Sequence, residues 1–420
     1  MKACHVYPRS IGSRAILMAA VLMATSLGAH AVDPLTLSVV KELPGIGGER
    51  MVVQGNRLYI QSDNSLAIYD ATDAGNPQLL GTLPLPTQAV GMQAGMTASD
   101  TLLALAAYPT SENVQRIYLV DVTTAAAPVI ENSWAVNVSS MVLNGSYLYL
   151  TVPSTNTFQV YDVSTPASPQ AVFNALQRVL PVEAGGTSTD TGYAEGVAIS
   201  GHYAFTRFGS GRQENTGKAL LPLLVSWDIT NPAATTEAAA LTIPTTRTYY
   251  HPSCAIAGTT AFFGCFFFDA APESKGGSTF DVTNPTSPAF LADMNWNAND
   301  VGTAGTSLYA APVAGNQCVL MALENGLAFV DLSSPALPYV KGTRTTTLND
   351  ALFLGNYIAA LLPDKIVLYR KPGVGSTFDA YSVIPAEVGL SAAATLTVQG
   401  NGFSAGTTVA LTNGTDTLNA

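Results

Sequence analysis

Apolar residues recur along most of the chain in short runs, and the runs are grouped into a repeating unit. Each unit begins with an apolar run, a glycine-centred turn and a second apolar run. Runs of this length and alternation predict half-buried β-strands. Glycine tolerates a positive φ, so the turn between them predicts a tight hairpin. Such hairpins are expected at residues 51–60, 141–150, 197–202, 254–259 and 351–356.

A third run in each unit ends in an aspartate, which is followed by Ser or Thr and, in most copies, by prolines. The Asp carboxylate can accept hydrogen bonds from backbone N–H groups two residues on. Proline cannot donate to a ladder, so it separates one strand from the next. We therefore predict that each repeated aspartate is a structural turn residue, with a ligand role as the alternative. The six copies are Asp70, Asp121, Asp162, Asp228, Asp281 and Asp331.

Each unit thus contains four antiparallel strands, which is the composition of a β-propeller blade, and repetition at a fixed period favours the same architecture. The repeated phrase resembles the LVIVD repeat, a bacterial β-propeller repeat whose third strand ends in Asp before a Ser/Thr-x-Pro turn. The resemblance covers Leu35 to Arg370. It implies a scaffold and an exported location, and it implies no activity.

The two ends of this region are complementary. Asp350 to Arg370 provides three strands and lacks the fourth, whereas Leu35 to Leu43 reads as a fourth strand with no unit of its own. We predict that the N-terminal strand completes the last unit and joins the ends of a ring. The fold class is then all-β, a seven-bladed β-propeller spanning residues 32–371.

The first 31 residues are predicted to be an export signal. Lys2, Arg9 and Arg14 form a basic start, an apolar run follows from Ala15 to Gly28, and residues 29–31 fit a small-x-small cleavage pattern. The run is shorter than the about 20 residues that a membrane-spanning helix needs. We expect no transmembrane helix and an exported protein located in the periplasm, on the cell surface or outside the cell.

Residues 372–380 read as a linker, and the pattern changes after them. Residues 381–420 resemble the start of an IPT/TIG immunoglobulin-like domain, because they include a Gly-x-Gly-Phe turn at Gly400 to Phe403. The match spans less than half of the about 100 residues of an immunoglobulin-type sandwich. We therefore expect a truncated β-sandwich that is partly ordered.

Charge and chemistry narrow the function. Without residues 1–31 the chain has 15 basic and 29 acidic residues, a net charge of −14, so a nucleic-acid partner is not expected. His202 and His251 are predicted to lie at opposite ends of the propeller, and the common catalytic motifs are absent. Disulfide pairing among Cys254, Cys265 and Cys318 is undecidable from sequence. The sequence does not set the oligomeric state.

One end of the propeller is predicted to carry the variable loops, where function usually resides on a rigid scaffold. The charged residues Arg207, Arg212, Glu214 and Lys218 are expected to be part of a solvated loop there. The connections expected to be enlarged are Pro109–Val114, Glu183–Glu195, Arg207–Ala219, Asp269–Gly277 and Pro312–Gln317.

The mouth of the central channel should lie at the same end. Counting back from each hairpin turn places polar residues at the start of each innermost strand; the candidate binding residues are Glu49, Ser139, Glu195, His251, Asp300 and Asp350. Oxygen ligands suit Ca²⁺, and the four acidic residues of this set are its candidate ligands, with no other cofactor expected. The alternative is that these side chains hydrogen-bond the backbone of the adjoining loops.

Three functions are compatible with this pattern. The first is an exported interaction or scaffold protein that binds a protein or glycan through the loop-rich face. The second is an exported hydrolase or lyase that uses His251 with Asp300 or Asp350. The third is a structural spacer in a larger surface protein. A histidine and a carboxylate within hydrogen-bond reach in a deep pocket would favour the enzyme, whereas carboxylates bonded to loop amides would favour the binding protein.

Overall fold

The computed structural model describes residues 35–90, 95–109, 112, 114–175, 177–181, 192–209, 220–244, 249–267, 274–296, 312–315, 318–323, 326–372, 379–384, 397–401, 410–412 and 417–419. Across these residues the secondary structure consists of β-strands and a short 3-10 helix, η2 (Pro232–Ala234). No helix in these ranges is long and apolar enough to cross a membrane.

The strands up to Asn174 form three sheets, numbered in chain order. Sheet 1 contains β3 (Arg50–Gln54), β4 (Arg57–Ser62), β5 (Ser65–Asp70) and β6 (Gln78–Pro84). Sheet 2 contains β7 (Thr87–Val90), β8 (Met96–Ala98), β9 (Leu102–Pro109), β10 (Arg116–Asp121) and β11 (Val129–Ala135), with β7 and β8 both paired to β9. Sheet 3 contains β12 (Ser140–Asn144), β13 (Tyr147–Val152), β14 (Thr157–Asp162) and β15 (Gln170–Asn174).

The strands from Tyr193 onward form four more large sheets, two of which also include an N-terminal strand. Sheet 4 contains β16 (Tyr193–Ser200), β17 (Tyr203–Gly209), β18 (Leu223–Asp228) and β19 (Thr236–Thr242). Sheet 5 contains β20 (Tyr249–Ala257), β21 (Thr260–Phe267), β22 (Ser274–Asp281) and β23 (Ala289–Trp296). Sheet 6 contains β24 (Pro312–Gly315), β25 (Cys318–Leu323), β26 (Gly326–Asp331), β27 (Tyr339–Thr345) and β1 (Leu35–Thr36). Sheet 7 contains β28 (Asp350–Leu354), β29 (Tyr357–Leu361), β30 (Lys365–Arg370) and β2 (Val39–Pro44).

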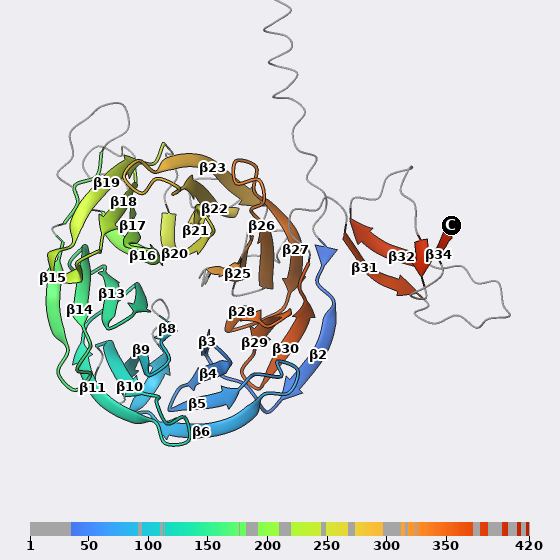
Figure 1. The fold of residues 1–420 in the computed structure, drawn as a ribbon, viewed down its shortest axis with the longest axis horizontal. Helices are drawn as coiled ribbons and strands as arrows, with labels where there is room; N and C mark the ends of the chain where they lie inside the picture. Colours follow the sequence, from blue (N-terminus) through green and yellow to red (C-terminus); the bar gives the residue numbers. More distant parts are fainter. Residues whose placement is uncertain are drawn as a thin grey trace, which may run out of the picture. The chain divides into compact units, whose positions relative to one another are not determined.

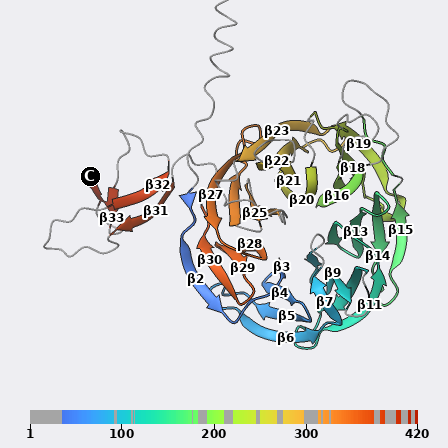
Figure 2. The same ribbon diagram turned by 180° about the vertical axis from the view of Figure 1, so that it is seen from behind.

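The sheets are arranged in a ring around a central axis (Figures 1 and 2). The innermost strand of each sheet, which is β8 in sheet 2 and the first β-strand after β2 in chain order in the other sheets, contacts the innermost strand of the next sheet, and the cycle closes where β28 meets β3. Buried apolar side chains fill the space between neighbouring sheets, as where β4 and β5 pack against β9 and β10. The chain is therefore an all-β propeller, as predicted, in which each sheet buries its faces against its two neighbours.

The N-terminal segment joins the two ends of the ring. β2 pairs antiparallel with β30, with Val39 opposite Tyr369 and Leu43 opposite Ile366, which confirms the predicted pairing of the first and last strands. The structure adds a second contact that the sequence did not predict: β1 pairs parallel with β27 of sheet 6. The segment divides because Leu37 is buried between sheets 6 and 7, where Gly342 leaves room for it.

The end of the ring that carries the hairpin turns and the Asp turns is called the turn end here. In all six predicted copies the Asp Oδ1 accepts a hydrogen bond from the backbone N–H two residues on, at 2.8–2.9 Å. The Ser or Thr hydroxyl two residues on, together with this backbone N–H, holds the pKa of five of the carboxyls below its usual value: Asp70, Asp121, Asp162, Asp228 and Asp281. The structural role predicted for these aspartates is confirmed.

The hairpin glycines behave as predicted too. Their φ angles lie between +56° and +60° at Gly55, Gly145, Gly201, Gly258 and Gly355. A residue with a Cβ adopts this positive φ only at a cost in conformational energy, so the turn geometry favours glycine.

The Asp turns also hold neighbouring sheets together. Asn132 Nδ2 donates to Ala167 O in the turn of sheet 3 (2.6 Å), and Thr279 Oγ1 donates to Pro335 O in the turn of sheet 6 (2.7 Å). The turn of sheet 2 approaches β6 even more closely at Gly81, where a Cβ would lie 2.2 Å from Ala125 O. Each of these turns therefore docks on the sheet that precedes it in the ring.

The outermost strand of each of the seven sheets contains one β-bulge at the same place. In sheet 1, for example, Asp70 lies opposite Gln78, and the bulged residue is Leu80, two positions further on. In six sheets the bulged residue is exposed or half-buried, as with Leu80 in β6 and Val40 in β2. Bulges twist an edge strand and disfavour pairing with another chain. In sheet 6 the bulged residue is Lys341, which is buried beside Asp331, with Lys341 Nζ 3.9 Å from Asp331 Oδ2. This is the sheet whose outer edge is covered by β1.

One predicted connection is wrong. Pro312–Gln317 was expected to be an enlarged loop between second and third strands, but Pro312–Gly315 is β24, the innermost strand of sheet 6. The hairpin of this sheet follows Gly315, and the third strand β26 begins at Gly326.

Beyond the propeller, four short strands form two separate two-stranded sheets. β31 (Asp379–Ile384) pairs with β32 (Thr397–Asn401), and β33 (Ala410–Thr412) pairs with β34 (Thr417–Asn419). An immunoglobulin-like sandwich is not shown by these strands. The expected linker overlaps β31, which begins at Asp379.

Candidate functional site: the loop end of the propeller

The end of the ring opposite the turn end carries the longer connections and is called the loop end here. Three residues that precede an innermost strand make the same backbone hydrogen bond there. The N–H groups of Glu49, Ser139 and Asn349 each donate to the carbonyl of a residue on the second strand, at 2.7–3.0 Å. Glu49 and Ser139 therefore occupy equivalent positions in sheets 1 and 3, and Asp350 follows the equivalent position in sheet 7.

The Asp350 carboxylate connects sheet 7 to sheet 1. Its Oδ2 accepts a hydrogen bond from Met51 N–H on β3 (3.0 Å), and its Oδ1 accepts one from Ala351 N–H (2.8 Å). Burial raises the pKa of Asp350, and the Arg50 guanidinium and the two N–H groups oppose that rise. Arg50 Nη1 donates to the carbonyls of Glu49 (2.8 Å) and Asn349 (2.7 Å). The positive charge of the Arg50 guanidinium, which acts on Asp350, makes this junction unfavourable for a second cation.

Serine and threonine side chains join other sheets in the same manner. Val197 N–H on sheet 4 donates to Ser140 Oγ (3.2 Å), and Leu143 N–H on sheet 3 donates to Thr97 Oγ1 (3.0 Å). Ser139 Oγ donates to Ala194 O on sheet 4 at 2.7 Å. The partners Val197, Ala194 and Leu143 are strand residues, whereas the alternative stated from the sequence expected bonds to the backbone of the adjoining loops.

Glu195 lies on β16 and is only 7% exposed. Its Oε2 is 3.3 Å from Nη1 of Arg207, which is 1% exposed and lies opposite it on β17. Burial raises the pKa of Glu195 to about 8, against the opposing effect of Arg207. The carboxylate occupies space over Gly209, where a Cβ would lie 2.2 Å from Oε2. The glycine thus makes room for a buried ion pair.

The expectation that Arg207 is part of a solvated loop is wrong. β17 continues to Gly209, so Arg207 is a strand residue in the interior and not the start of a connection. The other three members of that predicted cluster, Arg212, Glu214 and Lys218, lie outside the described residues.

Two candidate residues are not placed. The side chain of His251 lies outside the described residues, although its backbone belongs to β20, where the pairing is irregular between Tyr250 and Ser253. Asp300 lies outside them too. Because β24 begins at Pro312, the count that placed Asp300 at the start of this innermost strand was wrong. The histidine–carboxylate pair expected of the enzyme is therefore not among the described side chains.

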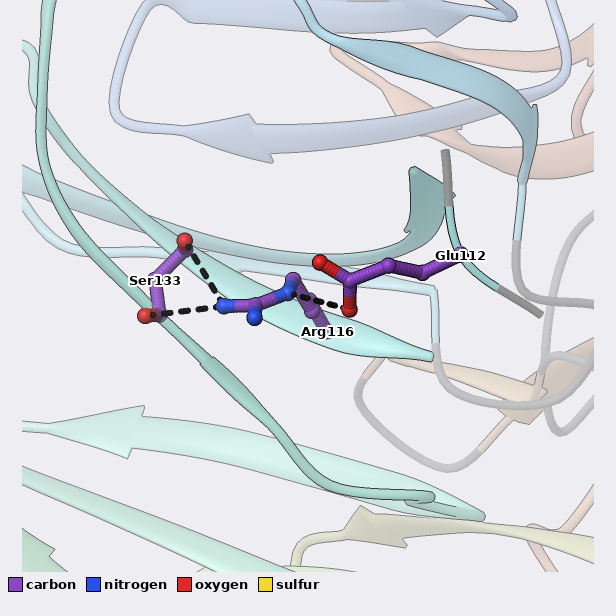
Figure 3. A network of polar contacts seen from close by, with 3 residues as sticks. All are labelled: Glu112, Arg116 and Ser133. Carbon is purple, nitrogen blue, oxygen red and sulfur yellow. Dashed lines mark hydrogen bonds and ion pairs between the residues drawn. The ribbon is translucent and has the colours of Figure 1, made fainter. Parts of the chain in front are cut away.

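One of the predicted loops is held in place by the network in Figure 3. Arg116 Nε donates to Glu112 Oε2 (3.0 Å), and Arg116 Nη1 donates to both oxygens of Ser133 on β11 (3.3 and 3.4 Å). This network fixes Glu112, in the connection from β9 to β10, against the sheet. Val114 in the same connection is exposed.

The loop end also presents an exposed aromatic residue that sequence reasoning missed. Tyr193, the first residue of β16, is 55% exposed. Val179, in the connection that leads from β15 to β16, is exposed too. Gly192 N–H donates to Arg178 O (2.9 Å), which brings the two ends of the connection together. Arg178 is anchored by an ion pair with Glu237 and by its guanidinium over the Trp227 ring. The sequence signal for this exposed aromatic residue is a tyrosine that directly follows a Gly/Thr-rich stretch.

The geometry of the described residues gives little support to a metal site or a reactive thiol. Among the residues that the structure describes, no group of three or more His, Cys, Asp or Glu side chains could hold a metal ion. The Cys254 thiol has a pKa well above its usual value because it is buried. Cys254 lies opposite Phe263, which is two residues from Cys265 and agrees with the predicted offset.

Comparisons with known proteins agree with this architecture. Solved structures share the fold: a putative 6-phosphogluconolactonase from Bacteroides uniformis (TM-score 0.51, 12% identity, 76% of this chain and 89% of that one) is one. The periplasmic gluconolactonase of Pseudomonas aeruginosa is another (TM-score 0.50, 12% identity, 71% of this chain and 85% of that one). Identity this low shows the fold alone. The class of this chain is thus a β-propeller protein.

A family model for the LVIVD repeat matches residues 136–176, 191–209 and 319–346. These segments include all four strands of sheet 3, β16 and β17 of sheet 4, and most of sheet 6. The chain is thus a β-propeller protein in which these three segments match the LVIVD repeat. A comparison with curated proteins gives no significant match.

Proposed function

We propose that this chain is an exported interaction or scaffold protein, a seven-bladed propeller that binds a protein or glycan through its loop end. Each of the seven large sheets is then one blade, and residues 1–31 direct export to the periplasm, the cell surface or the medium. The C-terminal strands belong to an immunoglobulin-like module. The observation that carries the proposal is the exposed Tyr193 on a connection anchored by Arg178.

The chemistry of this end favours binding over catalysis. Exposed tyrosine is a common anchor of binding interfaces because it buries a large area at a low conformational cost. The Asp350 carboxylate, by contrast, accepts bonds from two backbone N–H groups and joins two sheets. The alternative hydrolase or lyase, using His251 with Asp300 or Asp350, is therefore supported less. The two gluconolactonases share only the fold, so they add no activity to this chain.

A binding experiment tests the proposal directly. The exported form is presented to a glycan array and to purified envelope proteins, and each hit is measured again with Tyr193→Ser. We expect at least a tenfold loss of affinity, because a central aromatic anchor carries about 2 kcal/mol or more. Val129→Ser is the matched control, since Val129 is exposed at the opposite end of the propeller. Equal binding by the wild type and Tyr193→Ser would reject the loop end as the contact surface.

Export is tested separately. Expression with the native N-terminus should release a chain that begins near Val32, measured by mass spectrometry of the intact exported protein. A chain that keeps residues 1–31 in the cytoplasm would contradict the location and leave the binding measurement standing.

A further inference from the structure

Large apolar side chains are exposed on one part of the outer rim of the propeller. They lie near the turn end of four consecutive sheets, in the order 6, 7, 1 and 2 of the closed ring. Leu337 is the most exposed at 69%, followed by Leu79 at 57%. This group is called the apolar arc, and its members are Leu337, Val39, Val40, Leu79, Leu80 and Val129.

In other sheets the equivalent positions carry small or polar residues, or apolar residues that are half-buried. The Leu337 N–H donates to the carbonyl three residues earlier and so closes the turn of sheet 6. Ser168 in sheet 3 and Ser287 in sheet 5 make the same bond and therefore occupy the equivalent position. Leu79 lies opposite Tyr69 on β5, and the residues in the equivalent place are Ala171 in sheet 3 and Glu237 in sheet 4. In sheet 5 the place is taken by Phe290, which packs into the core. Isolated exposed apolar residues are ordinary, but a group confined to one part of the rim indicates an interaction surface.

The chain leaves the propeller at this arc. Arg370 N–H donates to Ser38 O (3.0 Å), immediately before Val39. Pro372 packs where Gly342 lacks a side chain, together with Leu37. The next strand, β31, begins at Asp379, and seven residue steps span at most roughly 25 Å. The C-terminal strands are therefore tethered within reach of Leu337 and Val39.

The tethered segment needs an apolar partner. Its described residues form two two-stranded sheets, β31–β32 and β33–β34. A two-stranded sheet is at best marginally stable in water and gains stability by packing on another element. Apolar residues occur in these strands at Tyr381, Val383, Leu411 and Leu418. A short tether gives an effective concentration in the millimolar range, so even weak complementarity favours docking within one chain.

We propose that the apolar arc is the docking surface for residues 379–420 of the same chain. The arc lies on sheets 6, 7, 1 and 2, whereas the Tyr193 connection joins sheets 3 and 4, so docking leaves that connection open. This proposal is independent of what the loop end binds. It assigns a role to exposed residues on β2, β6 and the turn before β27 that neither ring closure nor the loop end uses.

Hydrogen–deuterium exchange on the full chain tests the docking. The double variant Leu79→Ser, Leu337→Ser removes the two most exposed members of the arc, and both residues are surface residues that the core does not need. The expected result is at least fivefold faster exchange in residues 379–384 and 397–401, with exchange in sheets 1 to 7 unchanged. The matched control, Val114→Ser, Val179→Ser, alters exposed residues at the loop end and should leave the C-terminal strands unaffected.

Photocrosslinking gives a second readout that does not depend on protection. A photoreactive phenylalanine analogue at position 79 should give intramolecular adducts with peptides from residues 379–420. Unchanged exchange in the double variant would overturn the proposal, and so would exchange of the wild-type strands at the rate of an unfolded peptide. Adducts between two chains, or protection that rises with protein concentration, would overturn it in favour of a second copy on the arc.

Discussion

The turn end and the loop end of the propeller belong to the same strands, yet different interactions fix them. At the turn end each Asp bonds to a backbone N–H two residues away, as Asp70 bonds to Thr72, so the geometry is set within a few residues. At the loop end the polar side chains reach across sheets: Asp350 bonds to Met51, which is 299 residues away in sequence. The comparison shows that local signals fix the repeated turns, while the ring as a whole fixes the polar residues at the loop end.

The largest expected effect is at the loop end, in the buried pair of Glu195 and Arg207. Glu195→Ala leaves the Arg207 guanidinium buried without its carboxylate, and breaking a buried pair in this way costs about 3–5 kcal/mol. Arg207→Met should cost much less, because Glu195 can take up a proton, whereas arginine cannot release one. Urea denaturation of both variants measures the difference. Equal losses would contradict the assigned pairing.

The pH dependence of stability separates the two ends. Glu195 has a folded-state pKa raised to about 8 from the ordinary 4.5, so its contribution is complete below pH 4.5 and is lost as pH rises toward 8. The turn aspartates behave in the opposite sense: their pKa is lowered, so their contribution is present above the ordinary 3.8 and is lost as pH falls. Glu195→Gln should remove the alkaline decline and leave the acid limb unchanged, in denaturation curves measured from pH 3 to 9.

At the turn end, contacts between sheets are expected to matter more than backbone conformation. Gly81→Ala places a Cβ 2.2 Å from Ala125 O, and overpacking against backbone costs about 1–3 kcal/mol. Gly55→Ala meets nothing within 4 Å and bears only the penalty of a positive φ, about 1–2 kcal/mol. Chemical denaturation should give Gly81→Ala the larger loss. The reverse order would place the turn of sheet 2 away from β6.

A single turn aspartate should contribute modestly and uniformly. Asp70→Ala and Asp162→Ala each remove an exposed carboxylate that accepts a hydrogen bond from a backbone N–H, and solvent-exposed bonds of this kind contribute little to stability. Thermal melts of the two variants should agree within error. A much larger loss for either one, or a loss of ligand binding at the loop end, would mean that the repeated aspartate does more than close its turn.

Calcium is expected to have the smallest effect. Of the candidate ligands, Glu195 pairs with Arg207, Asp350 bonds to two backbone N–H groups, and Glu49 lies beside Arg50. Melting temperatures with calcium and with chelator should therefore agree within about 1 °C, where a bound ion at 100 times its dissociation constant would add about 2.7 kcal/mol. A clear upward shift with calcium would restore the metal-binding hypothesis.

What the sequence predicted correctly follows from this division. Gly55 and Asp70 act through their own backbone neighbourhood, so their roles could be read from a few residues. The pairing of β2 with β30 could be predicted because a fourth strand was missing at one end of the repeats and in excess at the other.

The errors lie where long-range packing decides. The place of β24 depends on which glycine forms the hairpin of sheet 6, and several glycines were available. Arg207 reads as a loop residue until Glu195 is seen opposite it on β16. The pairing of β1 with β27 depends on Leu37 filling the space above Gly342, and no local pattern shows that.

Amide hydrogen exchange in the closing strand tests the central claim, that the N-terminal segment closes the ring of sheets, most directly. We predict that those amides of Lys41 to Leu43 that donate to β30 exchange far more slowly than the amides of an unpaired chain, because the two strands share one ladder. Rapid exchange of these amides, at the rate of an unpaired chain, while Ile366 to Leu368 remain protected would contradict the account.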